Sequence, residues 1–227
     1  VSGYPQEFLS LPPELLRLVM TRQLKFFPVS GVNGAPQPYF VGVRDGASRG
    51  QRNVEDGFRG VLEARLRDAM FFYRRDLAVP LPELDARLGS VTFREGLGSM
   101  ADKTARVVKL TALLCAGCGR PVDGAAAGQA AAHAYSDLAS GLVREFTGLQ
   151  GVMGGYYAAA AGLPPAVSRA IAEFYMPLTP SSPLPSSAEG SLAALAGRID
   201  SIACDLSLGL EPTGSEDPHG LRRQARG

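Results

Sequence analysis

The sequence DLASGLVREFTGLQGVMGGYY, at residues 137–157, is the stretch that says most about the fold of this 227-residue chain. Apolar residues recur at helical spacing in its first half, which predicts a buried helix face made of Leu138, Leu142, Val143 and Phe146. Its second half is rich in glycine, and each glycine inside a helix costs about 1 kcal/mol relative to alanine. Because the chain accepts this cost repeatedly, we expect another segment to pack closely against a short helix of small residues.

The composition is that of a globular chain. Hydrophobic residues make up 45% of the sequence and charged residues 20%, which is enough apolar material for a core. No run approaches the 18 apolar residues of a membrane span, and the start VSGYPQEF lacks the features of a secretory signal. The chain begins without Met and ends on the basic stretch GLRRQARG. We therefore expect a fragment of a longer, cytoplasmic protein that does not enter a membrane.

Net charge and cysteine content narrow the function classes. A net charge of +1 argues against a general polyanion binder, so any nucleic-acid contact has to come from local arginine patches. An odd, low count of three cysteines suits a reducing compartment. Cys115 and Cys118 have the spacing of metal ligands, but no second pair completes a four-ligand zinc site. We interpret them as ordinary thiols at a helix end.

Residues 1–90 are predicted to form an α/β segment. Residues 8–25 carry an apolar stripe at helical spacing, and two short strands follow at 26–29 and 38–43, joined by a turn. A long helix is expected over 53–77, where apolar residues recur every three or four positions. Its arginines, among them Arg65, would usually line a solvated helix face, but they could also face phosphate.

Residues 91–227 are predicted to be almost entirely helical. Helices are expected from residue 97, over 130–146, 163–175 and 191–208, with 119–128 as a Gly/Ala-rich linker. The helix over 191–208 is predicted to turn one apolar face inward: Leu192, Leu195, Ile199, Ile202, Ala203 and Leu206. The predicted fold class is therefore α+β and mainly α, with a hairpin-containing N-terminal piece and an all-helical second domain from residue 91.

The last segment carries helix-capping chemistry. Ser215, Glu216 and Asp217 can cap a final helix, with Pro218 in its first turn. Arg222 and Arg223 would follow one turn later. Two surface arginines in a capped helix and a local phosphate contact explain this pattern about equally well.

Several separated blocks resemble one family, in the same order along the chain. They are FFPV with PYFVGV (26–29 and 38–43), VLEARLRDAMFF (61–72), LGSMADKTARVVKL (97–110), EFTGLQGVMGGYYA (145–158) and GLEPTGSEDPHGLRR (209–223). Together they resemble the beta subunit of bacterial heterotetrameric glycyl-tRNA synthetase. The family usually shows Gly-Asn-Glu where this chain has Gly57-Phe58-Arg59, which puts any role of the last two positions in doubt.

The resemblance implies a role in ATP-dependent attachment of glycine to tRNA. In that family the alpha subunit forms the adenylate and uses ATP and Mg²⁺, whereas the beta subunit binds tRNA(Gly) and completes an alpha2beta2 assembly. This segment would then supply tRNA binding and scaffolding, with no catalytic residue, cofactor or metal of its own. The tRNA-contacting residues that we expect are Arg65, Lys103, Arg222 and Arg223.

The helices from 97 to 208 also resemble the HD phosphohydrolase superfamily, whose His and Asp side chains converge on divalent cations. By helix position, Thr104 stands where that superfamily has its first His ligand. Ser136-Asp137 stands in place of the His-Asp pair, and Gly197 stands in place of the final Asp. Only Asp137 keeps a ligand. With the nearby His133 it gives two ligands at best, too few for a metal site. We interpret this part as an HD-like domain that has lost its chemistry and serves as a scaffold.

Two other functions stay open from the sequence. One is a residual, metal-dependent HD phosphohydrolase, which Asp137→Ala would abolish together with metal binding. The other is a pure protein–protein module, which would hold the alpha subunit without any affinity for RNA.

Overall fold

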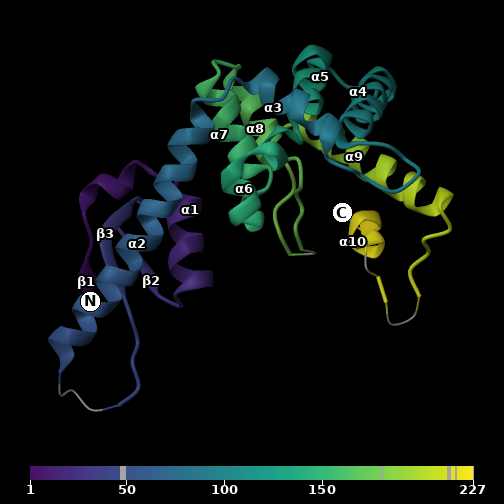
Figure 1. Ribbon diagram of the computed structural model, residues 1–227. Coiled ribbons are helices and arrows are strands. Elements are labelled where there is room, and N and C mark those ends of the chain that lie inside the picture. Colours follow the sequence, from purple (N-terminus) through teal and green to yellow (C-terminus); the bar gives the residue numbers. More distant parts are fainter. Residues whose placement is uncertain (47–49, 180, 214–215, 218, 227) are drawn as a thin grey trace. The chain divides into compact units, whose positions relative to one another are not determined.

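The computed structural model describes residues 1–46, 50–179, 181–213, 216–217 and 219–226 (Figure 1). The chain forms two compact units, Val1–Ala78 and Val79–Gly227. A domain boundary near residue 90 stays a prediction. A small sheet lies in the first unit and the second is helical, which confirms the predicted α+β, mainly α class. None of the described helices is both long and apolar enough to cross a membrane.

The first unit contains a three-stranded antiparallel sheet in the order β1-β3-β2. The predicted hairpin is present: β2 (Phe27–Ser30) pairs with β3 (Pro36–Val41). On the other edge of β3 lies β1 (Ser2–Gly3), which was not predicted. Two residues are too few to show the alternation that identifies a strand in a sequence.

Helices cover the rest of this unit. They are η1 (Gln6–Ser10), α1 (Pro13–Leu18), the π-helical η2 (Val19–Gln23) and the long α2 (Gln51–Leu77). A Cβ atom on Gly42, just after β3, would lie 2.7 Å from the Phe58 ring of α2. That ring also packs against Phe26, with the centroids 5.1 Å apart. Phe58, which departs from the family pattern, is therefore a packing residue.

The second unit is a helical assembly in which α4, α5 and α9 pack together and α7 packs on α8 (Figure 1). The unit begins with α3 (Leu81–Arg87), η3 (Leu88–Ser90), α4 (Met100–Gly117) and α5 (Gly124–His133). Three short helices follow: η4 (Ser136–Ala139), α6 (Gly141–Glu145) and η5 (Thr147–Leu149). The last helices are α7 (Val152–Ala160), α8 (Pro165–Glu173), α9 (Ala188–Ser207) and α10 (Leu221–Arg226).

Two of the predicted elements between 119 and 146 are wrong. The linker predicted over 119–128 ends at Gly124, because the Asp123 carboxylate accepts the N–H groups of Ala125 and Ala126 and starts α5 early. The single helix predicted over 130–146 is broken after His133. A new helix, α6, starts where the Ser140 hydroxyl accepts the N–H of Val143.

The close packing predicted from the glycines is present at the contact between α7 and α8. A Cβ on Gly155 would lie 2.7 Å from the Cβ of Ala172, and one on Gly154 would lie 2.9 Å from Ile171. Three of the four predicted apolar residues before this contact are fully buried, while Leu138 is half-buried. The glycines thus allow α8 to approach the backbone of α7.

The predicted inward face of α9 is wrong. Leu195, Ile199 and Leu206 are 43%, 38% and 48% exposed. Small and acidic residues are buried instead: Gly190, Ala193, Ala194, Ala196, Gly197, Asp200, Ser201 and Asp205. The physical reason is that the buried acids have cationic partners on earlier segments. Asp200 pairs with Lys103 and Arg106, and Asp205 pairs with Arg94, so the face with these acids turns inward.

Candidate functional site

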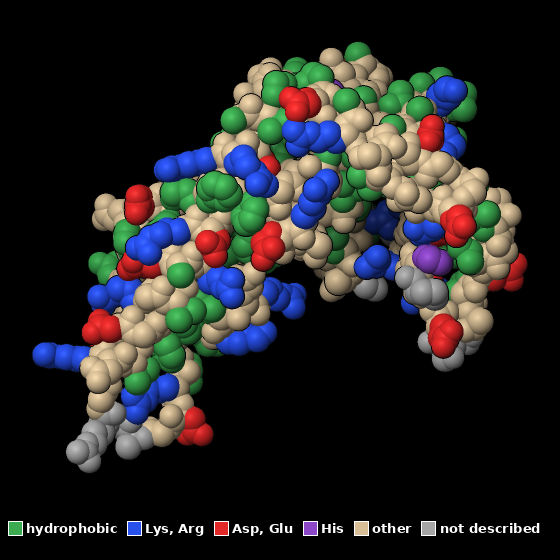
Figure 2. Space-filling view, in the orientation of Figure 1, with side chains coloured by type: hydrophobic (Ala, Val, Ile, Leu, Met, Phe, Trp, Pro, Cys, Tyr) green, Lys and Arg blue, Asp and Glu red, His purple; other side chains and the backbone are tan. Residues whose placement is uncertain are grey.

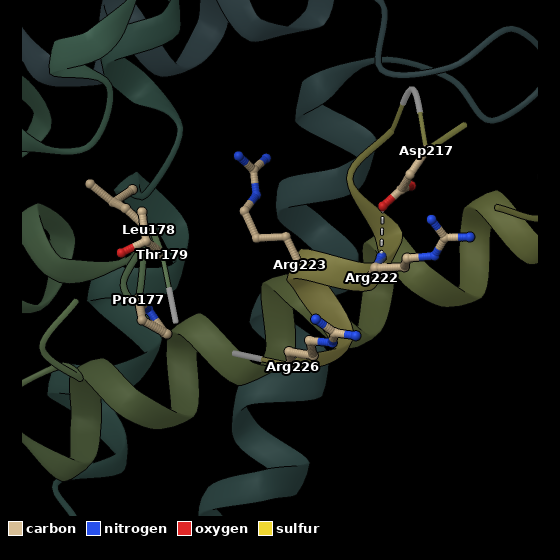
Figure 3. A pocket seen from close by; sticks show the side chains of 7 residues that line it. All are labelled: Pro177, Leu178, Thr179, Asp217, Arg222, Arg223 and Arg226. Atoms are coloured by element: carbon tan, nitrogen blue, oxygen red, sulfur yellow. Dashed lines mark hydrogen bonds between the residues drawn. The ribbon is translucent and has the colours of Figure 1, made fainter. Parts of the chain in front are cut away.

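A hollow of about 400 Å³ lies beside α10 in the second unit (Figure 3). One wall is the segment after α8 and the other is α10 with the turn before it. The lining residues are Pro177, Leu178, Thr179, Asp217, Arg222, Arg223 and Arg226. The site therefore combines an apolar wall with a strongly cationic one.

The cationic wall is positioned by helix capping. The Asp217 carboxylate accepts the N–H groups of Leu221 at 2.8 Å and of Arg222 at 2.9 Å, as predicted for this residue; Ser215 and Pro218 lie outside the described residues. Desolvation opposes the charge of Asp217, but these donors outweigh it and hold its pKa below the usual range. The Arg222 guanidinium donates a hydrogen bond to the backbone carbonyl of Thr213.

Arg222, Arg223 and Arg226 are all exposed on this wall. Arg223 extends from α10 toward the side of Leu178 and Thr179, whereas Arg222 points the other way (Figure 3). Figure 2 shows blue Lys and Arg side chains around the hollowed region in this part of the molecule. Within the described residues neither Arg223 nor Arg226 forms an ion pair. Their positive charge therefore remains available to an anion.

Arg198 of α9 joins the two walls. Its guanidinium donates to the carbonyl oxygens of Pro177 at 3.0 Å and Tyr175 at 3.3 Å, on one wall. It also donates to the carbonyls of Arg223 and Gln224 in α10, both at 3.4 Å. Burial, and secondarily the positive charge of Arg223, lower the pKa of Arg198. The hollow is thus held by a half-buried cation that no sequence pattern singled out.

Lys103 is buried inside the helical unit, with only 3% of its surface exposed. Its Nζ lies 2.7 Å from the Asp200 carboxylate and donates to the Ser201 hydroxyl at 2.8 Å. Arg106 binds the same carboxylate at 2.6 Å. The contact with tRNA predicted for Lys103 is therefore replaced by an internal one, because burial keeps its ammonium away from any phosphate. Its role in this structure is to link α4 to α9.

A second internal ion pair joins the segment before α4 to the same helix, α9. Arg94 binds the buried Asp205 carboxylate through two nitrogens, at 2.7 and 3.2 Å. The Phe93 ring lies beside three cations, with the Lys103 Nζ 4.3 Å from its centroid. Such cation–ring contacts add to the ion pairs in a desolvated site. This cluster is structural and was missed in the sequence because its members are about 100 residues apart.

Arg65 lies on the exposed face of α2 in the first unit. Its neighbours Arg67 and Glu63 form a surface ion pair of 2.8 Å one helical turn apart. Arg65 has no ion-pair partner among the described residues. Its contact with phosphate stays a prediction, and it lies on a different unit from the α10 arginines.

The positions equivalent to HD ligands are filled by packing and hydrogen bonds. Thr104 donates to the carbonyl of Met100 within its own helix, and Ser136 donates to the Asp85 carboxylate. At Gly197 a Cβ would lie 2.5 Å from the Phe174 ring, which occupies that space. In the described part of the chain, no three His, Cys, Asp or Glu side chains converge as metal ligands would.

The remaining HD-like residue, Asp137, is fully buried. Its Oδ2 accepts the N–H groups of Gly151 at 2.6 Å and Gly154 at 2.9 Å, at the start of α7. Burial raises its pKa to about 7, and the backbone donors oppose that rise. His133 is hydrogen-bonded to Asp85 instead, at 2.9 Å. Asp137 therefore anchors a helix start.

Cys115 and Cys118 are free thiols.

Comparison with known proteins places these features in one family. The family model described as "Glycyl-tRNA synthetase beta subunit" matches residues 1–227. The chain is 41% identical over 225 residues to the glycine–tRNA ligase beta subunit of Desulforudis audaxviator, covering 99% of this chain and 33% of that protein. It is 40% identical over 226 residues to the Bacillus subtilis beta subunit, with the same coverage. The Nitratidesulfovibrio vulgaris beta subunit is 42% identical over 220 residues, which is 97% of this chain and 31% of that protein.

The chain spans about a third of the length of the curated relatives that it matches. The match runs through both structural units. On the family match and on these identities, the chain belongs to the glycyl-tRNA synthetase beta subunit family.

Proposed function

We propose that this chain is the part of a glycine–tRNA ligase beta subunit that contributes tRNA binding and subunit scaffolding to the glycylation of tRNA(Gly). ATP and Mg²⁺ would be bound by the alpha subunit of a cytoplasmic alpha2beta2 assembly. This segment would supply no catalytic residue. The HD-like helices would serve as a rigid frame, in which Asp137 and Lys103 are structural groups.

The observation that carries the tRNA part of the proposal is the exposed arginine pair Arg223 and Arg226, which has no ion-pair partner in the described chain. Because the net charge is only +1, RNA binding depends on local clusters of this kind. Arg222 lies beside the pair and Arg65 offers a separate contact on α2. Arginine suits phosphate because its planar fork can donate two hydrogen bonds at once.

The exposed face of α9 supports the scaffolding part. Leu195, Ile199 and Leu206 recur along this face at helical spacing and are 38–48% exposed. Apolar side chains gathered on a surface are typical of protein contacts. We place the alpha subunit on this face, because relatives named as beta subunits imply a second kind of subunit.

The tRNA part is tested by binding of glycine tRNA to the protein with Arg65→Ala, Arg222→Ala or Arg223→Ala. Each loss of a phosphate contact should weaken binding several-fold and reduce its salt dependence. Arg169→Ala is the matched control, because Arg169 is an exposed arginine of α8 outside the hollow. Affinities equal to that of the control for all three variants would refute the tRNA assignment.

The scaffolding part is tested by co-purification with the alpha subunit. Leu195→Gln combined with Ile199→Gln should reduce recovery of the complex, whereas Leu113→Gln, at a 69% exposed leucine of α4, should not. Undiminished recovery of the double variant would remove α9 from the interface. Retention of the alpha subunit without affinity for tRNA would favour a pure protein–protein module.

A further inference from the structure

We propose that the hollow beside α10 binds one unpaired ribonucleotide, with its phosphate at Arg223 and Arg226 and its base against Pro177 and Leu178. This inference rests on the proposed tRNA-binding function and names the part of the RNA that the site takes. A paired helix and a bare phosphate are the alternatives that the test below separates.

The phosphate end of the ligand follows from the charges. Arg223 and Arg226 lie in the lining, and within the described residues no ion pair neutralises them. The carboxylate of Asp217 faces the same hollow, but its two oxygens accept backbone N–H groups of α10. Arg198 adds another positive charge close to Arg223. An anion between these arginines would relieve their mutual repulsion.

The base end follows from the opposite wall. Leu178 is 58% exposed and, with Pro177, it presents an apolar surface across from Arg223 (Figure 3). An apolar surface facing an arginine pair contributes little to a bare phosphate. It suits the flat face of a base, which proteins hold against apolar side chains or guanidinium planes.

The size and shape of the hollow select an unpaired nucleotide. A volume of about 400 Å³ lies within the range of pockets that enclose small ligands. Bases in a duplex are stacked inside the helix, so a duplex could touch only the rim with its phosphates. An unpaired base can swing out of the stack and enter the hollow.

Arg198 makes this a built site, because it fixes the distance between the two walls. Its four hydrogen bonds run to carbonyl oxygens of both the Pro177 segment and α10. We assign Arg198 as a positioning residue that holds the apolar and cationic walls at the spacing of one nucleotide. It needs no direct contact with the RNA for this role.

The experiment uses the full-length beta subunit in its complex with the alpha subunit and measures displacement of a labelled glycine tRNA. The competitors are a single-stranded RNA tetranucleotide, a twelve-base-pair RNA duplex and inorganic phosphate. Leu178→Ser should weaken displacement by the tetranucleotide about tenfold, as expected for the loss of one base contact. It should leave displacement by the duplex and by inorganic phosphate unchanged, because neither ligand uses the apolar wall. Leu113→Ser is the matched control for an exposed leucine outside the hollow.

Arg198→Lys separates positioning from charge, because it keeps the cation but loses the forked hydrogen bonds. We expect it to reduce binding of the tetranucleotide about as much as Leu178→Ser, with little effect on the duplex. A Leu178→Ser protein that binds the tetranucleotide as the control does would overturn the nucleotide site. If Arg223→Ala still weakened tRNA binding, the proposed function would stand. If Leu178→Ser had no effect on the tetranucleotide and the Arg65→Ala, Arg222→Ala and Arg223→Ala proteins all bound tRNA as the control does, both the nucleotide site and the tRNA assignment would be refuted.

Discussion

The Oδ2 atom of Asp137 lies 2.6 Å from the backbone nitrogen of Gly151 and accepts its hydrogen bond. The carboxylate thereby ties the turn at η4 to the start of α7, in the stretch that organises the sequence. Its other oxygen, Oδ1, is buried and has no hydrogen-bond partner among the described residues. The residue that the resemblance to the HD superfamily would make a metal ligand holds the backbone of a glycine-rich helix in place.

The protonation of Asp137 predicts a pH dependence of stability. Burial raises the pKa of this carboxyl in the folded protein to about 7, from 3.8. The folded state therefore binds the proton more tightly than the unfolded state, and stability falls as the pH rises between these values. For one group the slope is at most about 1.4 kcal/mol per pH unit. The neutral variant Asp137→Asn should lack this contribution, so its stability relative to wild type should improve as the pH rises from 5 to 7. Urea unfolding at several pH values measures it, and parallel pH profiles would contradict the account.

The internal role of Lys103 predicts a stability loss on its removal. Lys103→Met would take away one of the cations that neutralise the buried Asp200 carboxylate. Breaking a buried pair in this way costs about 3–5 kcal/mol, and the remaining Arg106 should keep the cost near the lower value. Lys109→Met is the matched control, because Lys109 is an exposed lysine of the same helix. Chemical denaturation should show a large loss for the first variant and almost none for the second. Equal midpoints would mean that the ion pair contributes little.

The close contact of α7 with α8 predicts opposite effects for two glycine-to-alanine changes. Gly155→Ala would place its Cβ 2.7 Å from Ala172 and 2.8 Å from the Ser168 carbonyl. Overpacking of this kind costs about 1–3 kcal/mol. Gly128→Ala in α5 meets nothing within 4 Å and should stabilise the protein by up to about 1 kcal/mol, through helix propensity. Thermal unfolding compares the two. Stabilisation by Gly155→Ala would show that the helices can move apart at no cost.

The packing of Phe58 predicts that its departure from the family pattern is structural. Phe58→Asn would remove a ring that contacts Gly42 and Phe26 in the first unit. We expect a loss of about 1–3 kcal/mol, measured by denaturation. The binding of tRNA by the folded variant should not change. A weaker affinity at unchanged stability would instead give this position a role in recognition.

The sequence predicted those parts of the fold that depend on residues close together in the chain. The hairpin at β2 and β3, the long α2 and the glycine contact of α7 all follow from residues close together in the sequence. The inward face of α9 did not, because Asp200 is buried through Lys103 and Arg106, about a hundred residues earlier. Nothing near Asp200 in the sequence signals these partners. A leucine stripe and a stripe of small and acidic residues share this helix, and only the distant cations decide which one turns inward.

Of the candidate site, the sequence likewise predicted only the residues that local patterns single out. Arg222 and Arg223 follow a capping residue in the sequence, and the structure places both at the hollow. Arg198 could not be identified, because its role depends on carbonyl groups of two segments that meet only in the fold. Lys103 was expected to contact tRNA on the family resemblance, and its burial could not be foreseen because the local sequence around it shows no acid in position to pair with its ammonium.

The most direct test of the account is the salt dependence of glycine tRNA binding by the complete complex, for wild type and for the double variant Arg223→Ala, Arg226→Ala. The account predicts weaker binding and a plot of log affinity against log salt that is shallower by about two phosphate contacts. Arg169→Ala should leave both the affinity and the slope close to those of wild type. A double variant with the affinity and slope of this control would contradict the claim that α10 contacts tRNA.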